Sequence, residues 1–322
     1  MYIITGGAGF IGSALIAKLN AEGITDILIV DELGKDEKWK NIRNKSFLDY
    51  LHKHDFVDKI RGGETFRGLK GIVHLGASSS TTETDMDYLM ENNYRYTGIL
   101  ANYALEYKVR FIYASSAATY GDGTQGYSED EITTHKLTPL NPYGYSKHLF
   151  DLQVLREKLE TRFVGLKFFN VYGPNEAHKV DQRSMVMNAY EQIKNDGAVK
   201  LFCSHRADYK DGEQQRDFVY VKDCTNVIFW LLQNQKVNGI FNLGTGKARS
   251  WNDLVHAVFA ALQKPPRIDY VEMPVNLRAH YQYFTEARME KLRQTSCPVT
   301  FHTLEEGVKD YVVNYLEKRE VL

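Results

Sequence analysis

The sequence predicts an α/β protein whose main body is a doubly wound parallel sheet, with a smaller, interleaved α/β lobe attached. Two observations carry this prediction. Apolar, β-rich runs alternate with helical stretches through the first half of the chain, which is typical of parallel strands joined by crossover helices. The runs are apolar throughout rather than at every second position, as expected of strands that are covered on both faces.

Each element follows from its own stretch of sequence. "YIIT" (2–5) is a short buried strand, and "GGAGFIGSALIAKLNAEG" is a glycine turn followed by an amphipathic helix. The later strands are "DILIVD" (26–31), "GIVHLGA" (71–77), "RFIYASS" (110–116) and "FVGLKFFNV" (163–171), with helical stretches such as 87–107 and 144–160 between them.

The rhythm becomes less regular after about residue 170. "SMVMNAYEQIKNDG" is helical, "VKLFC" is a short strand, and 204–215 is a polar loop. "RDFVYVKDCTNVIFWLLQN" is a strand, a turn and a helix, and "GIFNLGTG" is a strand that ends in glycines. We therefore predict two interleaved units, residues 1–169 plus about 217–245 and residues 170–216 plus about 246–322.

Composition excludes several classes of protein. The chain has 322 residues, which exceeds the size at which a single core usually stops growing. A net charge of −1 gives no electrostatic reason for binding nucleic acid or a membrane surface. No run approaches 18 apolar residues, and the N-terminus has no signal-peptide pattern, so we expect a cytoplasmic protein. Cys203, Cys224 and Cys297 stand far apart, which indicates reduced thiols and no metal site.

The glycine turn indicates dinucleotide binding. Gly6, Gly9 and Gly12 form G-x-x-G-x-x-G between a strand and a helix, and Asp31 closes the next strand about 20 residues later. Residues without a side chain let the backbone approach a pyrophosphate, which the helix N-terminus then binds. We assign this function to the first unit and substrate binding to the second.

The residues around Asp31 leave the choice of dinucleotide open. A carboxylate at this position accepts hydrogen bonds from a free ribose 2′-hydroxyl, which favours NAD. Lys38 and Lys53 follow, and they would neutralise a 2′-phosphate, although both also fit the pattern of solvated surface lysines.

Tyr143 and Lys147 are the candidate proton-transfer pair. Residues four apart share a helix face, so a lysine ammonium below the tyrosine is expected to lower the pKa of the phenol toward neutrality. Ser116 ends a predicted strand on the edge where parallel sheets bind ligands, and either contacts a substrate hydroxyl or simply caps a turn. Tyr190 and Lys194 have the same spacing on an ordinary amphipathic helix, so spacing alone does not identify a site.

These motifs, in this order, resemble the extended short-chain dehydrogenase/reductase family and, within it, the ADP-heptose 6-epimerases. The strings that carry the resemblance are "TGGAGFIG", "GITDILIVDEL", "SSSTTETD", "YASSAATYG", "NPYGYSKHLFD", "FFNVYGPNEAHK", "RDFVYV", "IFNLGTG" and "HYQYFTEA". The resemblance implies a Rossmann-like fold and a homo-oligomer, with a pentamer among the candidate sizes. It also implies one tightly bound NADP per subunit, with NAD as the alternative.

The resemblance also implies roles for individual residues. Ser116, Tyr143 and Lys147 would form the catalytic triad, with Lys179 as a second acid/base on the opposite side of the sugar. The cofactor set consists of Gly6, Gly9, Phe10, Ile11, Gly12, Asp31, Glu32, Lys38, Lys53, Leu75, Gly76, Ala77, Ser78, Ser79, Asn92, Lys147, Val171 and Lys179. The substrate set consists of Asn170, Asp181, Asn188, Phe202, Cys203, Ser204, His205, Arg216 and Tyr281. Arg216 makes independent sense, because a guanidinium pairs with a diphosphate through two hydrogen bonds.

The implied reaction is epimerisation of ADP-D-glycero-D-manno-heptose at C6, a step of lipopolysaccharide core synthesis. A base takes the proton of the C6 hydroxyl, the nicotinamide takes the hydride from C6, and the hydride returns to the other face. The cofactor thus emerges unchanged. Val180, Asp181 and Asn175 depart from the usual family pattern near the expected sugar site, so the exact sugar and nucleotide are less determined than the type of reaction.

Three alternatives remain. A nucleotide-sugar 4,6-dehydratase would need carboxylic acids after the serine, where this chain has Ala117 and Ala118, which donate no proton. An epimerase or reductase of another nucleotide sugar shares the fold and the triad. A non-catalytic dinucleotide sensor would keep the glycine turn but would have no use for Tyr143 and Lys147 together.

Overall fold

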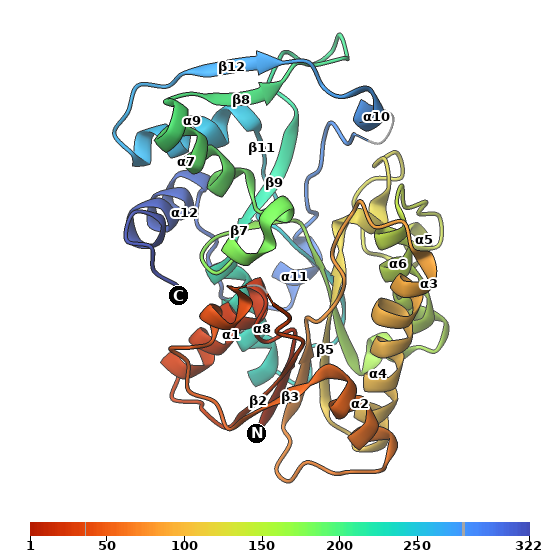
Figure 1. The fold of residues 1–322 in the computed structure, drawn as a ribbon. Helices are drawn as coiled ribbons and strands as arrows, with labels where there is room; N and C mark the ends of the chain where they lie inside the picture. The colour runs from red at the N-terminus through yellow and green to blue at the C-terminus, as the bar shows by residue number, and fades with distance from the viewer. Residues whose placement is uncertain (36, 279–280) are drawn as a thin grey trace.

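A seven-stranded, wholly parallel sheet is the centre of the molecule (Figure 1). The computed structural model describes residues 1–35, 37–278 and 281–322. The strand order is β10-β6-β5-β4-β1-β2-β3, so the order reverses between β1 and β4. The strands are β1 (Tyr2–Thr5), β2 (Ile27–Asp31), β3 (Asp49–His52), β4 (Gly71–His74), β5 (Arg110–Ser116), β6 (Phe163–Phe168) and β10 (Gly239–Leu243).

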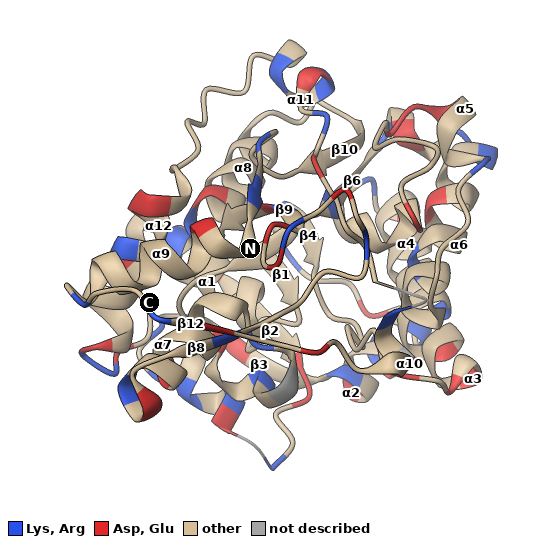
Figure 2. Ribbon diagram, turned by 90° about the horizontal axis from the view of Figure 1, so that it is seen from above, with Lys and Arg blue, Asp and Glu red and all other residues tan. Residues whose placement is uncertain are grey.

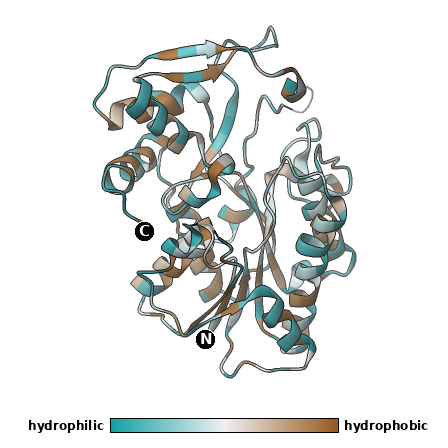
Figure 3. Cartoon of the chain, in the orientation of Figure 1, coloured by the Kyte–Doolittle hydropathy of each residue, from teal (hydrophilic) through white to brown (hydrophobic). Residues whose placement is uncertain are grey.

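Helices cover both faces of this sheet, which is why its strands, apart from the edge strand β3, consist mainly of apolar residues (Figure 3). One face packs against α1 (Phe10–Ala21) and α8 (Val221–Gln233). The other face packs against α2 (Lys53–Arg61), α4 (Tyr96–Glu106) and α6 (Pro142–Arg156). Ile4 belongs to the first cluster and Ile3 to the second, so consecutive residues of one strand fill two cores.

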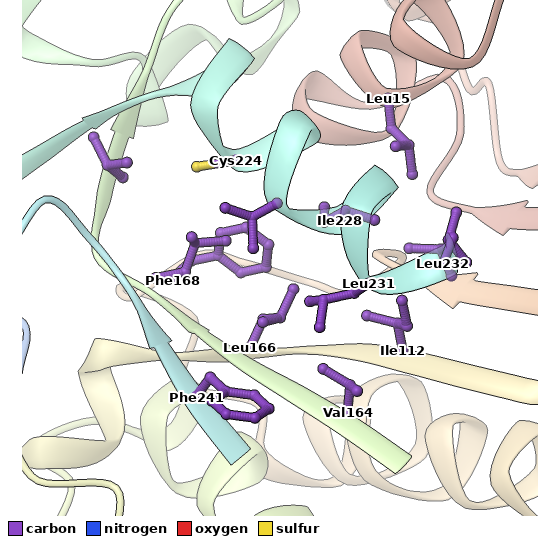
Figure 4. Packing of buried hydrophobic residues seen from close by; sticks show 14 of the residues in the cluster. Leu15, Ile112, Val164, Leu166, Phe168, Cys224, Ile228, Leu231, Leu232 and Phe241 are labelled. Carbon is purple, nitrogen blue, oxygen red and sulfur yellow. The ribbon is translucent and has the colours of Figure 1, made fainter. Parts of the chain in front are cut away.

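Figure 4 shows the first of these cores, where α8 crosses the sheet. Ile228 and Leu231 of α8 lie over Ile112, Val164 and Leu166 of β5 and β6, and all five are fully buried. Burial of each such side chain contributes about 1.5–3 kcal/mol.

A second group of elements lies beyond the carboxyl edge of the sheet (Figure 1). It contains the three-stranded sheet β11-β9-β7 and the two-stranded sheet β12-β8. Its members are β7 (Asn170–Tyr172), β8 (Val199–Phe202), β9 (Gln215–Tyr220), β11 (Ala248–Ser250), β12 (Ile268–Val271), α7 (Met185–Asp196), α9 (Trp251–Ala261), α10 (Val275–Arg278) and α12 (Leu304–Tyr311). The short helix α11 (Glu290–Gln294) instead packs against β10, and its Leu292 belongs to the core of the central sheet. Phe10 and Ala14 of α1 pack into the core of the second group, so the two groups share a buried contact beside the glycine turn.

The remaining elements are short and lie at the edges of the sheet or between longer helices. They are η1 (Glu37–Asn41), α3 (Met86–Leu89), η2 (Met90–Arg95), η3 (Ala117–Tyr120), α5 (Glu131–Thr134), η4 (Leu159–Thr161), η5 (Ala177–Gln182) and η6 (Val312–Leu316).

The fold class expected from the sequence is confirmed, with shifts at several boundaries. The stretch expected as one helix at 87–107 is α3 and α4 separated by the π-helical turn η2. The helix expected at 144–160 begins at Pro142, because the Asn141 side chain accepts the N–H of Gly144 and proline is favoured in a first turn. The division into two interleaved units stays a prediction.

Figure 2 shows basic and acidic residues interleaved over the elements. No helix within residues 1–35, 37–278 and 281–322 is long and apolar enough to span a membrane. The same residues contain no group of three or more His, Cys, Asp or Glu side chains placed to hold a metal ion.

The glycine turn is built by close backbone contacts. Gly6 has φ +65°, and a Cβ on it would lie 2.6 Å from the backbone nitrogen of Gly76, at the end of the adjacent strand β4. A Cβ on Gly12 would lie 2.1 Å from the carbonyl oxygen of Gly6. Backbone atoms on both sides leave no room for a side chain, which explains the glycines physically.

Substitution of Gly12 by alanine tests this packing. Gly12→Ala forces the turn apart, so we expect a loss of about 1–3 kcal/mol in the free energy of unfolding, measured in urea on protein stripped of cofactor. Gly98→Ala in α4 is the matched control, because nothing lies within 4 Å of a Cβ there. Since alanine is the better helix former, the control should be neutral or stabilised by about 0.5–1 kcal/mol. Equal losses in the two variants would contradict the close-contact explanation.

Candidate active site

A cavity of about 830 Å³ opens at the carboxyl ends of the central strands, where the strand order reverses. Its walls come from both groups of elements. The glycine turn and the ends of β2, β4 and β5 form one side, and Phe218, Trp251 and Leu254 form part of the other. This volume is at the upper end of the range for ligand pockets.

Most of the site residues expected from the sequence line this cavity. They are Gly6, Gly9, Phe10, Ile11, Gly12, Asp31, Glu32, Lys38, Lys53, Leu75, Gly76, Ala77, Ser78, Ser79, Asn92, Ser116, Tyr143, Lys147, Asn170, Val171 and Lys179. The chain thus brings together residues that are up to 173 positions apart, since the set runs from Gly6 to Lys179.

The other substrate residues lie farther into the second group of elements, outside the lining of this cavity. Asn188 is on α7, Phe202 ends β8, and Cys203, Ser204 and His205 follow it. Arg216 is on β9, and Tyr281 follows α10. Asp181 belongs to η5, and its side chain lies outside the described residues.

Sequence reasoning missed several wall residues. His178, Gln182 and Arg183 line the cavity from η5 and the turn after it, and Tyr88 and Tyr96 line it from α3 and α4. Only Gln182 of the first three is exposed, but none of them belongs to a periodic apolar pattern, so the sequence offered nothing to find them. The two tyrosines lie close to Asn92 in one helical stretch, and that spacing was the only available signal.

Tyr143 is in the first turn of α6 and bonds to Ser116 at the end of β5. Ser116 also accepts the N–H of Ala118 at 3.1 Å, so it caps η3 and contacts the tyrosine at once. Burial raises the pKa of Tyr143, and the Ser116 hydrogen bond partly opposes this rise. The expectation that this pKa falls toward neutrality was therefore wrong for the protein alone, because desolvation of the phenolate outweighs the hydrogen bond from Ser116.

Lys147 is 5% exposed and follows Tyr143 by one helical turn. Its Nζ donates to the carbonyl oxygen of Ala114 at 2.9 Å, which fixes the amine against the end of β5. Burial lowers the pKa of Lys147 to about 8, and the negative charge of Asp151 opposes the shift. His74 lies near enough that burial, assisted by the Lys147 charge, holds the pKa of its imidazole well below the usual value.

Tyr190 and Lys194, the second Tyr–Lys pair with this spacing, do not line the cavity. Tyr190 and Lys194 lie on α7, and both contact the carboxylate of Glu317, at 2.7 and 3.0 Å. Burial and the Glu317 hydrogen bond raise the pKa of Tyr190 to about 12. The pair is a surface ion-pair cluster and not a proton-transfer site.

Lys179 reaches the cavity from a different element, η5. Its Nζ lies 5.7 Å from the centre of the Phe10 ring, beside the glycine turn. Burial lowers the pKa of Lys179, and the carboxylate of Glu176 opposes this. Glu176 is itself 1% exposed and accepts the Ser184 hydroxyl at 2.6 Å, so it closes the loop that carries the lysine.

The η5 segment joins the two sides of the cavity. The hydroxyl of Ser79, after β4, donates to Gln182 at 3.0 Å. The side chain of Asn41, at the end of η1, lies 3.1 Å from His178 and donates to the carbonyl oxygen of Asn175 at 3.1 Å. Asn41 also donates to the carbonyl oxygen of Ala8 in the glycine turn.

Two acid–lysine pairs stand where the second strand ends. Asp31 accepts the backbone N–H of Ala8 at 2.8 Å and the Nζ of Lys38 at 2.7 Å. Glu32 accepts Lys53 at 2.5 Å, and this contact lowers the pKa of Glu32. Asp31 therefore holds the glycine turn in place through Ala8, and Lys38 neutralises the charge of its carboxylate.

The residues fit a nicotinamide dinucleotide. The glycine cradle has no room for a Cβ, and α1 begins at Phe10 with no side chain capping its N-terminus. First-turn N–H groups without intrahelical partners are suited to a pyrophosphate. When bound, the nicotinamide would supply hydride transfer.

A family model described as "NAD dependent epimerase/dehydratase family" matches residues 2–244. The chain belongs to this family. An ADP-L-glycero-D-manno-heptose-6-epimerase of Nitratidesulfovibrio vulgaris is 56% identical to it over 316 residues, which are 98% of each chain. One of Fusobacterium nucleatum is 49% identical over 329 aligned positions, covering 99% of each chain.

A solved structure agrees with these relatives. The crystal structure of the Helicobacter pylori ADP-L-glycero-D-manno-heptose-6-epimerase superposes with a TM-score of 0.82 at 29% identity, covering 97% of this chain and 95% of that one. The resemblance stated from the motifs is therefore confirmed. The chain has the fold of this nicotinamide-dependent family along nearly its whole length.

Lys147→Met tests the cost of burying the amine. We expect the variant to lose turnover but to be more stable than wild type at pH 7, because it buries no ammonium. The native pKa of about 8 lies below the ordinary 10.5, so the unfolded chain binds this proton more tightly between those values. Wild-type stability due to this group then rises with pH across that window, and the advantage of the variant narrows.

Urea unfolding at pH 7 and near pH 10 measures the difference. A stability difference between Lys147→Met and wild type that stays constant with pH would contradict a buried, titrating amine at this position.

Proposed function

We propose that the protein inverts C6 of ADP-D-glycero-D-manno-heptose to give ADP-L-glycero-D-manno-heptose, as a step of lipopolysaccharide core heptose synthesis. One observation carries the proposal beyond the names of the relatives. The cavity with the glycine cradle has two candidate proton-transfer groups on separate elements, Tyr143 on α6 and Lys179 on η5. Inversion at a carbon needs a proton donor for each orientation of the hydroxyl, whereas a simple reductase needs one.

Tyr143, Ser116 and Lys147 would act as a unit in one of the two proton transfers. Ser116 holds the substrate hydroxyl beside Tyr143, whose phenol exchanges the proton of the C6 hydroxyl. Lys147, fixed by the carbonyl of Ala114, stabilises the phenolate that forms as the proton moves. Loss of the hydroxyl proton to the protein and of the C6 hydride to a bound nicotinamide would leave a 6-ketone, which could turn within the cavity.

Lys179 would serve the opposite orientation. The lowered pKa of Lys179 makes the amine a more effective proton donor and acceptor near neutral pH than a surface lysine. Which of Tyr143 and Lys179 serves which epimer is left open here. Ala117 and Ala118 follow Ser116 in η3, where a dehydratase would need acids, so no dehydration step is proposed.

Arg216 supports a diphosphate in the substrate. Its guanidinium is 7% exposed and lies between the rings of Trp251 and Tyr281, at 5.7 and 5.2 Å. It donates to the carbonyl oxygen of Gln215, and among the described residues no carboxylate pairs with it. A buried cation held by rings and lacking a counter-ion is suited to bind an anion.

We also propose that the cofactor is NADP. Lys38 and Lys53 neutralise the two carboxylates at the end of β2. A 2′-phosphate bound there would contact two lysines and would not be repelled by a net negative charge. Asp31 is occupied by the glycine turn and by Lys38, which weakens the argument from a lone aspartate toward NAD. Tight retention, one cofactor per subunit, a cytoplasmic location and a homo-oligomer complete the proposal.

Tyr143→Phe tests the proposed reaction. Purified protein without added cofactor should convert ADP-D-glycero-D-manno-heptose to the L-glycero epimer, with no net change in nicotinamide absorbance. Tyr143→Phe should keep its bound cofactor and lose about 10²- to 10⁴-fold in kcat, because it has no transferable proton. Tyr145→Phe is the matched control, since Tyr145 is 46% exposed and faces away.

Conversion is measured by separating the two epimers chromatographically. Folded, cofactor-loaded protein that leaves this sugar unchanged but converts another nucleotide sugar would overturn the substrate and favour the alternative epimerase or reductase. A dinucleotide sensor would convert neither.

Lys38→Met with Lys53→Met tests the cofactor. The double variant leaves Asp31 and Glu32 without their lysines, so repulsion of a 2′-phosphate should weaken NADP binding at least about tenfold more than NAD binding. The dissociation constants are measured by calorimetry on stripped protein. Equal losses for both dinucleotides would contradict the assignment of NADP.

A further inference from the structure

A fully buried ion pair lies directly behind the proposed catalytic helix face. The carboxylate of Asp151, one turn after Lys147 on α6, accepts the Nζ of Lys167 on β6 at 2.6 Å, and both side chains are 0% exposed. Neither residue lines the cavity. None of the roles assigned above uses this pair.

The pair joins every element that carries the proposed triad. Asp151 also accepts the hydroxyls of Tyr113 at 3.0 Å and Ser115 at 2.7 Å, both on β5. Lys167 also donates to the hydroxyl of Thr119 in η3 at 2.7 Å. Ser115 is the neighbour of Ser116, so one carboxylate fixes α6, β5 and β6 relative to one another.

Stability alone is a poor reason for such a pair. Taking two charges out of water costs several kcal/mol each, and replacing a buried pair with uncharged groups is often neutral or stabilising. Similar apolar side chains would hold α6 to the sheet at least as well. The charge of Asp151 therefore calls for another explanation, and it acts on one charged group outside the pair, Lys147.

The charges around Lys147 indicate what the Asp151 charge does. Burial drives Lys147 toward the neutral amine, and Asp151 opposes it. The other titratable groups around it are His74 on β4, whose imidazole is neutral, the phenol of Tyr143, and His148 with Lys167 behind the helix. Asp151 supplies the negative charge that favours the ammonium among them.

We propose that Asp151, held in place by Lys167, is a positioning residue of the redox site: it keeps Lys147 in its ammonium form and fixes the helix of Tyr143 to the strand end that carries Ser116. The inference rests on the proposed function, because it assumes the role given there to Lys147. Asp151 would thus act on the reaction through Lys147, without contacting the substrate.

The decisive variant is the double substitution Asp151→Asn with Lys167→Met, which removes both buried charges and leaves no unpaired ion. We expect stability near that of wild type, since an uncharged pair is no worse than a buried ion pair. The alkaline limb of the kcat–pH profile should nevertheless lie about one pH unit lower than in wild type. Asp151→Asn alone leaves the positive charge of Lys167 unpaired, so it should displace the limb at least as far and also lower the Tm.

Asp310→Asn is the matched control. Asp310 accepts Lys222 at 2.6 Å and the Tyr220 hydroxyl at 2.8 Å, a similar cluster away from the cavity lining. It should lower Tm and leave the alkaline limb unchanged. If the double variant keeps the wild-type limb, or if Asp310→Asn displaces the limb equally, Asp151 is only structural and the proposal falls.

A readout without substrate separates this proposal from the proposed function. Competitive labelling with acetic anhydride, followed by mass spectrometry of the peptide that contains Lys147, reports the pH at which this amine loses its proton. We expect that pH to fall by about one unit in the double variant. An unchanged value overturns the proposal even if wild type is an epimerase, and a lowered value supports the electrostatic role even if the sugar is a different one.

Discussion

The structure depends on one constraint, the placement of a charged amine where water hardly reaches. Lys147 is held between the carbonyl of Ala114 and the charge of Asp151, at the edge where the central strands end. A buried ammonium is costly, and the surrounding groups offset that cost only in part. The Asn141 cap, the Pro142 start and the buried contacts of α6 all serve to hold this one face of the helix against β5.

The two groups of elements divide the chemistry between them. The parallel sheet supplies the cradle for a dinucleotide and the Tyr143 side of the cavity, and the elements after residue 170 supply Lys179, Trp251 and the buried Arg216. Phe10 belongs to the core of the second group and also lies under Lys179, so a single residue links the cradle to the second proton-transfer group. Packing and catalysis are thus set by the same contacts.

Local sequence patterns predicted the fold well because they reflect requirements on residues that are close together in the chain. Continuous apolar runs need two covered faces, and a glycine turn before a helix needs space that only backbone can share. The short strand β3 was missed because Asp49–His52 is half-buried at the sheet edge and has no apolar run. The triad spacing was readable, but the sign of the Tyr143 pKa was not, since spacing shows which charges are near and not how much water is lost. Asp151 and Lys167 were missed for the same reason: their pairing depends on burial and on strand register.

The bridge made by η5 has a consequence for how such an enzyme would draw on the cell. Gln182 accepts the hydroxyl of Ser79 and His178 lies 3.1 Å from Asn41, so η5 is tied at two points to the elements around the glycine turn, and these ties would favour the retention of the dinucleotide proposed above. An enzyme that retains its nicotinamide would reuse the same bound hydride carrier in every turnover. Its rate would then be insensitive to the ratio of oxidised to reduced coenzyme in the surrounding solution, which suits an isomerisation that has no net demand for reducing power.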